Sequence, residues 1–189
     1  MSAISHQLKA GSWRLEAEMK HTISILVENK FGVLARISGL FSARGFNISS
    51  LAVGETEDPT VSRMTIVVEG DDKTLEQIKK QSNKLIDVIK VIDYKEGDFI
   101  DRELILVKVS SNPKTKKAIL EVIEVVGAKI ESEGEKSLCI EATGDQAKIR
   151  TLVELLKPFG ILEVVRTGRV AMDMTDKGLK ADGKPEVNE

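Results

Sequence analysis

Asn29 and Gly32 are the residues whose types and spacing could do chemistry, because both stand just ahead of an amphipathic helical stripe. A helix N-terminus presents unpaired N–H groups and the positive end of the helix dipole, so a carboxylate there gains about 0.3 to 1 kcal/mol. Gly32 has no side chain, which lets a ligand approach the amides of Val33 and Leu34. Asn29 can donate and accept. The pattern favours a site for a small zwitterion, although these types are also ordinary turn and capping residues.

Groups that could support catalysis or bind a metal are scarce. The chain holds two histidines, His6 and His21, and a single cysteine, Cys139. Neither histidine has a partner at a spacing that would make it an acid or a base. These three residues cannot furnish a usual His/Cys metal site, and no Asp-rich calcium loop occurs. We expect Cys139, which has apolar neighbours, to be a small core residue, and the chain to have no catalytic or metal site of its own.

Composition and charge restrict the class of protein. With 41% hydrophobic and 31% charged residues, the chain is typical of an ordinary soluble globular protein. A formal net charge of -2, with both signs interspersed, gives no electrostatic reason to bind nucleic acid. No apolar run approaches the roughly 18 residues that span a bilayer, and residues 1–19 lack the apolar segment of a secretory signal. We therefore expect a cytoplasmic protein without a nucleic-acid or membrane partner.

The elements that must position Asn29 and Gly32 follow from the periodicity of the first half. Apolar and β-branched runs predict strands at 21–28, 47–57, 61–70 and 87–96. Two helical stripes lie between them: Val33, Leu34, Ile37, Leu40 and Phe41, then Leu75, Ile78 and Leu85. We expect Gly45 to end the first helix and Asp71 or Asp72 to cap the second. The order βαββαβ is that of the ferredoxin-like fold.

The second half repeats this order with different residues. Strands are predicted at 102–110, 128–134, 136–144 and 161–170, with helical stripes at Ile119, Val122, Ile123 and Val126 and at Ile149, Leu152, Val153 and Leu156. Asn112 and Pro113 mark an N-cap and the first helical position. We therefore predict an α+β protein made of two tandem ferredoxin-like βαββαβ sandwiches, at 20–96 and 100–172. Residues 1–19 and 173–189 are expected to be a flexible extension and a flexible tail.

Asn47 begins the second predicted strand, which lies at the edge of the sheet in the ferredoxin-like order. An edge strand exposes backbone groups that invite pairing with another copy. If two such edges pair, Asn47 of one subunit can reach the helix N-terminus of the other. We therefore expect a homodimer in which ligand binding and dimer arrangement are coupled.

The segment 24–91 closely resembles the ACT domain found in the small, regulatory subunits of acetolactate synthase, also called acetohydroxyacid synthase. The most specific part is the run RGFNISSLAVGETEDPTVSRMTI at 44–66, since generic ACT domains share only the loop and helix. RELILVKV at 102–109 and EVVRTGRVAM at 163–172 resemble the corresponding ends of that family's C-terminal domain.

This resemblance implies a protein without an active site, which binds and activates a catalytic large subunit and makes it sensitive to feedback by branched-chain amino acids, above all valine. Thiamine diphosphate, Mg and FAD are expected in that catalytic partner and no cofactor in this chain. In the family the inhibitor lies between the ACT domains of two subunits. Carried over by motif, one subunit would supply Asn29, Gly32, Val33 and Leu34, and the other would supply Asn47 and Ile48.

Two other functions were weighed. An amino-acid-sensing transcriptional regulator of the ACT type would need a DNA-reading element, and neither end of the chain offers a helix-turn-helix pattern or a basic stripe. A metabolic enzyme on this fold would need acids, bases or nucleophiles that the chain lacks. The regulatory subunit is the function that the resemblance implies.

Overall fold

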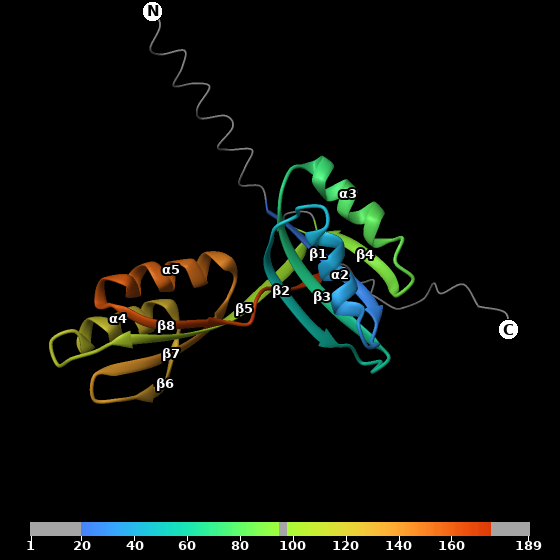
Figure 1. Ribbon diagram of the computed structural model, residues 1–189. Coiled ribbons are helices and arrows are strands. Elements are labelled where there is room, and N and C mark those ends of the chain that lie inside the picture. The colour runs from blue at the N-terminus through green and yellow to red at the C-terminus, as the bar shows by residue number, and fades with distance from the viewer. Residues whose placement is uncertain (1–19, 95–97, 175–189) are drawn as a thin grey trace, which may run out of the picture. The chain divides into compact units, whose positions relative to one another are not determined.

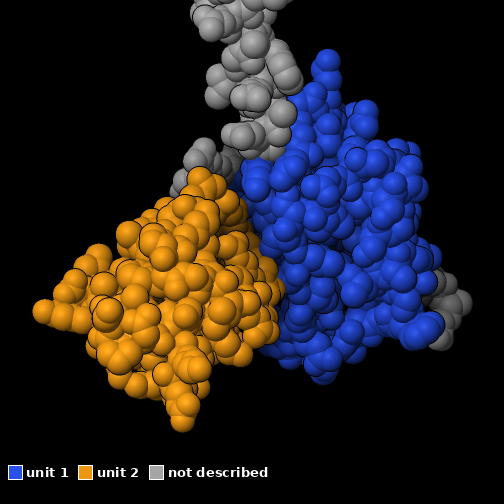
Figure 2. Space-filling model, turned by 60° about the vertical axis from the view of Figure 1, so that its left-hand side comes forward, with its two compact units in different colours: residues 1–100, 171–189 blue, residues 101–170 orange. Residues whose placement is uncertain are grey.

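The computed structural model describes residues 20–94 and 98–174, and they form two compact units. Unit 1 takes in the chain up to Ile100 and again from Ala171, and unit 2 runs from Asp101 to Val170 (Figure 2). The two units are described separately below. Each is a layer of two helices packed on one face of an antiparallel sheet (Figure 1).

Unit 1 has the element order expected from its periodicity. Its elements are β1 (Lys20–Glu28), α2 (Val33–Ser42), β2 (Ile48–Glu55), β3 (Val61–Glu69), α3 (Asp72–Ser82) and β4 (Val88–Tyr94). The strands lie in the order β2-β3-β1-β4, so β2 is an edge strand as predicted. This order confirms the ferredoxin-like sandwich for the first half.

The core of unit 1 forms where the apolar stripe of α2 meets the sheet. Val33, Ile37, Leu40 and Phe41 are buried against alternate residues of β1 and β3. Burying a side chain of this size contributes about 1.5 to 3 kcal/mol, so the stripe anchors α2 firmly. The start of that helix, and the loop before it, are thereby held at one end of the sheet.

Unit 2 repeats the topology. Its elements are β5 (Phe99–Ser110), α4 (Lys116–Val126), β6 (Lys129–Glu133), β7 (Ser137–Gly144), α5 (Gln146–Leu156), the short 3-10 helix η1 (Lys157–Phe159) and β8 (Ile161–Arg166). The sheet order is β6-β7-β5-β8, the same permutation as in unit 1. The predicted fold class, α+β with two tandem ferredoxin-like sandwiches, is therefore confirmed.

Two local predictions need correction. Helix α4 begins at Lys116 and not at Pro113, because the Asn112 side chain first closes a turn by accepting hydrogen bonds from the backbone N–H groups of Lys114 and Thr115. Cys139 is half-exposed and lies outside the core, because in β7 it points to the face opposite the buried Leu138 and Ile140.

The end of the described chain returns to unit 1. Strand β9 (Val170–Asp173) pairs with β5, and the buried Tyr94 hydroxyl donates to the carbonyl of Ala171 at 3.3 Å. The segment expected to be a flexible tail therefore starts within a strand. Residues 1–19 and the remainder of that tail, 175–189, lie outside the described residues. The limits 20–96 and 100–172 stay a prediction, and they differ from the units in where residues 171 and 172 fall.

Candidate functional site

Helix α2 starts at a residue that only glycine suits. Gly32 is its N-cap and has the left-handed angles φ 81 and ψ -4, which other residues rarely adopt. A Cβ atom at this position would lie 3.2 Å from Nη1 of Arg36, closer than an ordinary van der Waals contact. The backbone conformation therefore calls for glycine at this position, and the role of Gly32 in ligand binding stays a prediction.

Some of the first backbone N–H groups of α2 donate hydrogen bonds within the chain, and others do not. Val33 N–H donates to the carbonyl of Lys30 at 3.3 Å, and Arg36 N–H donates to the carbonyl of Gly32 at 3.0 Å. Within residues 20–94 and 98–174, no hydrogen bond is found from the amides of Leu34 and Ala35 to any acceptor. Of the two predicted amide donors, Val33 is thus engaged within the chain and its side chain is buried, whereas Leu34 is half-exposed and its amide can serve a ligand.

In the other three α-helices of the described chain, a side-chain oxygen accepts backbone N–H groups at the helix start or in the turn just before it. Asp71 and Asp145 are the N-caps of α3 and α5, and each carboxylate accepts a backbone N–H three residues on at 2.8 Å. Asn112 does the same ahead of α4, at 2.9 and 3.1 Å. Such an acceptor satisfies the donors at a helix start and complements its dipole. Helix α4 has no side-chain bond at its N-cap Thr115, but α2 is the one helix of these four without a side-chain acceptor either at its start or in the turn just before it.

Asn29 holds the loop before α2 against the far end of β2. Its side-chain Nδ2 donates to Oε1 of Glu55 at 3.0 Å and to the carbonyl of Pro59 at 2.9 Å, and its backbone N–H donates to the carbonyl of Thr60 at 2.7 Å. Both amide hydrogens of the side chain are therefore used within the protein. The group that Asn29 can offer a ligand is its Oδ1, an acceptor suited to an ammonium group.

An ion pair lies beside the start of α2. Arg36 Nε donates to Oδ2 of the buried Asp87 at 2.7 Å, and Glu28 N–H donates to the Asp87 carbonyl at 2.9 Å. Asp87 thereby ties the loop before β4 to the loop after β1, and Arg36 places a cation next to Gly32. Asp87 balances the charge of Arg36, so the guanidinium can favour a carboxylate at this end of the helix through its N–H groups and not through a net charge.

Sequence reasoning missed Arg36, Glu55 and Asp87. Arg36 could have been found, since it stands one helical turn after Gly32. Glu55 could have been found by placing the end of β2 beside the loop that precedes α2. Asp87 is 51 residues from Arg36, and no local pattern links the two.

Asn47 and Ile48 lie at the opposite end of β2 from Asn29. The amide of Asn47 donates to Glu69 Oε2 at 3.5 Å, and the Ser49 hydroxyl donates to Glu69 Oε1 at 2.8 Å. These hydrogen bonds, that of Ser49 first, lower the pKa of Glu69. Eight residues of extended strand span roughly 26 Å, several times the length of an amino acid. One copy of the chain therefore does not bring Asn29 and Asn47 together.

Other chemistry finds little support in the described chain. His21 is half-buried and its Nε2 lies 3.1 Å from the carbonyl of Gly70, a structural contact at the end of β1. Over residues 20–94 and 98–174, no group of three or more His, Cys, Asp or Glu side chains is placed to hold a metal ion. No helix in the same residues is long and apolar enough to cross a membrane.

Two family models match the chain, one in each half. Residues 23–90 match the ACT domain described as AHAS small subunit-like, and residues 102–175 match the family described as small subunit of acetolactate synthase. The first match contains the loop before α2, all of α2 and all of β2. The matches therefore cover the candidate site and most of unit 2.

Whole-chain relatives agree with these matches. A probable acetolactate synthase small subunit from Archaeoglobus fulgidus is 52% identical over 154 residues, which are 82% of this chain and 96% of the relative. The acetolactate synthase small subunit of Mycolicibacterium smegmatis is 49% identical over 161 residues, 85% of this chain and 95% of that one. The crystal structure of the Thermotoga maritima acetolactate synthase small subunit superposes with a TM-score of 0.77 at 40% identity, covering 84% of this chain and 99% of that chain.

Proposed function

The chain belongs to the family of acetolactate synthase small subunits, and on this premise we propose that an amino acid bound at the start of α2 controls a separate catalytic subunit. The chain is a regulatory subunit and not itself an enzyme. Of the functions weighed from the residues, family membership favours this one over a transcriptional regulator. The single observation that supports the effector site is the start of α2, where no side chain accepts the backbone N–H groups. Asn29 and Arg36 lie next to these free donors.

The catalytic work belongs to the partner in this proposal. The large subunit would carry thiamine diphosphate, Mg and FAD, and this chain would carry no cofactor. Both subunits would act in the cytoplasm. The regulatory chain then contributes only binding free energy, through its contacts with the partner and with the effector.

The effector is a branched-chain amino acid, valine above all, held by its charged ends. Its carboxylate would accept the amide N–H of Leu34 at the start of α2, near Gly32 and the Arg36 guanidinium, where the helix dipole and the guanidinium N–H groups favour an anion. Its ammonium group would face Asn29 Oδ1 and the Glu55 carboxylate, which already holds the Asn29 amide at 3.0 Å. A ligand without the ammonium group would lose these contacts, so the corresponding 2-oxo acid should bind less tightly.

A second copy of the chain completes the site through β2. Antiparallel pairing of two β2 strands about a twofold axis sets the beginning of one strand opposite the end of the other. With the axis at Leu51, Asn47 and Ile48 of one copy lie opposite Glu55 and Gly54 of its partner, and Glu55 binds Asn29. Residues about 26 Å apart in one copy are thereby joined across the dimer. The homodimer would thus form through the two ACT domains.

Feedback follows as a linkage. If valine binds one arrangement of the dimer better than another, it shifts the population by its differential affinity. Coupling free energies of this kind are typically about 1 to 3 kcal/mol, and the catalytic subunit must weaken valine binding by the same factor as valine weakens its binding.

The direct test uses the pure chain and a separately made catalytic subunit. The chain alone should turn over no pyruvate, should stimulate the catalytic subunit, and should lose that stimulation when valine is added. Calorimetry with valine, leucine, isoleucine and 3-methyl-2-oxobutanoate would rank the ligands. A lack of stimulation with the cognate partner would refute the regulatory role, and equal affinity for valine and its 2-oxo acid would refute the ammonium contacts.

A further inference from the structure

The two asparagines predicted for the effector site are held in the same way. Asn29 Nδ2 donates to Oε1 of Glu55 at 3.0 Å, and Asn47 Nδ2 donates to Oε2 of Glu69 at 3.5 Å. Within residues 20–94 and 98–174, no donor is found for Oδ1 of either asparagine. Each amide therefore turns its nitrogen toward a glutamate and leaves its oxygen available as an acceptor.

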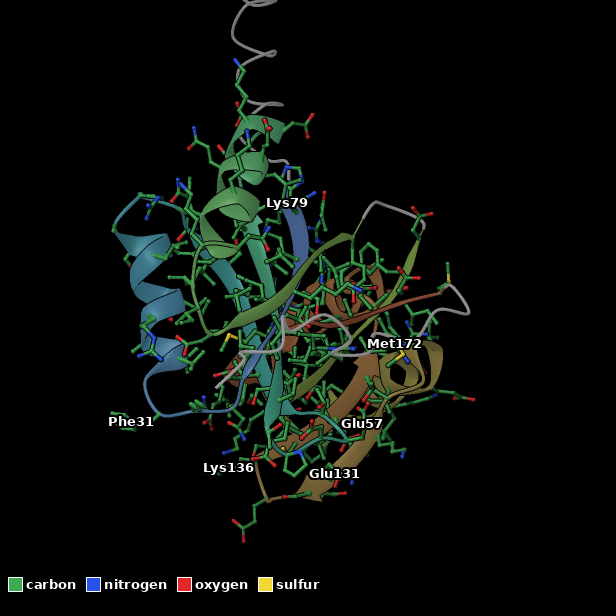
Figure 3. All side chains as sticks on the ribbon, turned by 90° about the vertical axis from the view of Figure 1, so that its right-hand side faces the viewer. Phe31, Glu57, Lys79, Glu131, Lys136 and Met172 are labelled. Carbon is green, nitrogen blue, oxygen red and sulfur yellow. The ribbon has the colours of Figure 1, made fainter. Side chains whose placement is uncertain are left out.

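These two amide–carboxylate pairs lie at opposite ends of β2. The first pair joins the loop before α2 to the end of β2, and Figure 3 shows Phe31 in that loop and Glu57 just after β2 at the same, lower end of unit 1. The second pair joins the start of β2 to the end of β3. The antiparallel pairing proposed above sets Asn47 of one copy opposite the partner's Glu55. The dimer would thus bring one pair from each copy to the same site.

Two further residues hold the Glu69 carboxylate in place at the end of β3. The Ser49 hydroxyl donates to its Oε1 at 2.8 Å, and Lys20 Nζ lies 3.5 Å from the same oxygen. Ser49 is the extra residue of a β-bulge in β2, a feature that re-aims a side chain. The Ser49 bond, followed by that of Asn47, lowers the pKa of Glu69. The carboxyl is therefore ionised at neutral pH and can only accept hydrogen bonds.

An ionised carboxylate favours one orientation of the Asn47 amide. When Nδ2 faces Glu69, an N–H donates to the carboxylate. When the amide is rotated by half a turn, Oδ1 faces the carboxylate, and two acceptors meet without a proton between them. The bond to Glu69 therefore keeps Oδ1 of Asn47 on the side away from that carboxylate.

Unit 2 shows that the fold does not require a carboxylate at this position. Glu69 stands two residues before Asp71, the N-cap of α3. In unit 2, the residue that stands two before Asp145, the N-cap of α5, is Thr143. The same topology is thus completed without an acidic side chain at the end of the equivalent strand. The role of Glu69 is therefore to be sought in the residues that it holds.

We propose that Glu69 is a positioning residue of the effector site, which holds the Asn47 amide so that Oδ1 faces the ammonium group of an amino acid bound to the partner copy. This inference rests on the proposed function, because it takes the ammonium contacts and the β2 pairing from it. The ammonium group then meets one amide oxygen from each copy, that of Asn29 and that of Asn47. A ligand without N–H donors leaves both oxygens unpaired, so the two amide orientations set the preference for an amino acid over its 2-oxo acid.

The test is titration calorimetry on the full chain with valine and with 3-methyl-2-oxobutanoate. Glu69→Lys replaces the acceptor by a donor, so Asn47 should turn its oxygen to the lysine and its nitrogen to the ligand. We expect valine affinity to fall about tenfold and the affinity for the 2-oxo acid to fall less than about twofold, because only valine offers N–H donors to the lost oxygen. The ratio of the two affinities cancels any effect on the dimer or on the carboxylate that both ligands share.

Two further variants separate orientation from charge. Glu69→Gln removes the charge but keeps a side-chain oxygen, which Ser49 and Lys20 hold in the acceptor position, so valine affinity should stay within about threefold of the parent. Glu121→Lys is the matched control, since it makes the same change of charge at an exposed residue on α4 of unit 2. It should change neither affinity. Circular dichroism checks that each variant is folded.

Each outcome decides one point. If Glu69→Lys lowers both affinities by the same factor, or lowers neither, Glu69 does not position Asn47, and the effector site itself stands. A loss of valine affinity in Glu69→Gln as large as that in Glu69→Lys would assign the effect to charge and overturn the positioning role. The same change of ratio in Glu121→Lys would overturn it as well. A parent chain that binds no valine removes the proposed function, and the role of Glu69 with it.

Discussion

The starts of α2 and α4 occupy equivalent places in two units of the same topology, yet they treat their backbone N–H groups differently. Before α4, the Asn112 side chain accepts the N–H groups of Lys114 and Thr115, in the turn that leads into the helix. Before α2, the backbone turns at Gly32 in a left-handed conformation, and the helix carries no side-chain cap. In unit 2 a side chain therefore binds the donors of the turn before the helix, whereas in the described part of unit 1 no side chain does so before α2.

The loops that lead into these helices differ in the same sense. Asn29 follows β1 and Asn112 follows β5, so the two asparagines hold similar positions. Their side chains, however, bind different partners. Asn112 bonds its own turn, and Asn29 bonds Glu55 and Pro59, 26 and 30 residues away. The hydrogen bonds of Asn112 close a local turn, whereas those of Asn29 hold its loop against distant residues. An asparagine before a helix therefore does not reveal its role until its partner is known.

Gly32→Asp should produce the largest effect, because it gives α2 the internal carboxylate that Asp71 and Asp145 give their helices. The new side chain would compete for the same amides and repel the effector carboxylate. We expect valine affinity to fall at least about thirtyfold, or about 2 kcal/mol, the upper range for charge at a partly buried helix end. Calorimetry measures the loss, with circular dichroism to confirm the fold. Unchanged valine binding would show that α2 is not the effector site.

Asn29→Ala should have the next largest effect, about a tenfold loss of valine affinity. It removes the Oδ1 acceptor and also the two bonds that hold the loop against Glu55 and Pro59. Each such bond contributes about 0.5 to 1.5 kcal/mol. Titration calorimetry on the pure chain gives the value. A variant with full affinity and lost partner stimulation would reassign Asn29 from the effector to the catalytic subunit.

Asn112→Ala, the matched change in unit 2, should lower the free energy of unfolding by about 1 kcal/mol, because it removes the hydrogen bonds that close the turn before α4. Valine affinity should not change, because the cap satisfies only its own unit. Urea denaturation followed by circular dichroism measures the first quantity and calorimetry the second. If this variant weakens valine binding as much as Asn29→Ala does, the contrast between the two helix starts carries no functional meaning.

Ser49→Ala should have the smallest effect, a rise in the pKa of Glu69 towards its ordinary value, since the Ser49 hydroxyl is the first cause of its lowering. A carboxyl with a lowered folded pKa stabilises the fold above its unfolded pKa and loses that contribution as the pH falls through the folded pKa. The variant should therefore be less stable than the parent at neutral pH, should lose less stability through that acid window, and should match the parent below it. Carbon-detected NMR titration of the Glu69 carboxyl is the measurement. A pKa that does not move would mean that Ser49 does not hold Glu69 in solution.

Much of the fold could be predicted because its signals are local. The apolar stripe of α2, the cap at Asp71 and the glycine at 32 each follow from residues within one or two turns. The alternation of periods then gave the order βαββαβ twice, and topology placed β2 at an edge. The predicted start of α4 was wrong. Asn112 closes a turn before the helix, so the pattern of Asn followed by Pro placed the helix start too early.

The candidate site was predictable only in part, because half of its residues depend on long-range partners. The glycine and the exposed amide near it follow from the sequence. The use of the Asn29 donors by Glu55 and Pro59, and the bond between Arg36 and Asp87, depend on how strands and loops meet after folding. The same is true of the bond between Asn47 and Glu69, which are 22 residues apart in the sequence.

The bond from the Tyr94 hydroxyl to Ala171 has a consequence for anyone who would dissect the chain. The polypeptide returns to unit 1 after it has completed unit 2. Unit 2 is therefore inserted within unit 1 in the sequence and does not simply follow it. A fragment that stops at Ile100 would lack β9 and leave that hydroxyl without its acceptor. Unit 2 runs without a break from Asp101 to Val170, but cuts at these residues would shorten β5 (Phe99–Ser110) and divide β9, which pairs with β5.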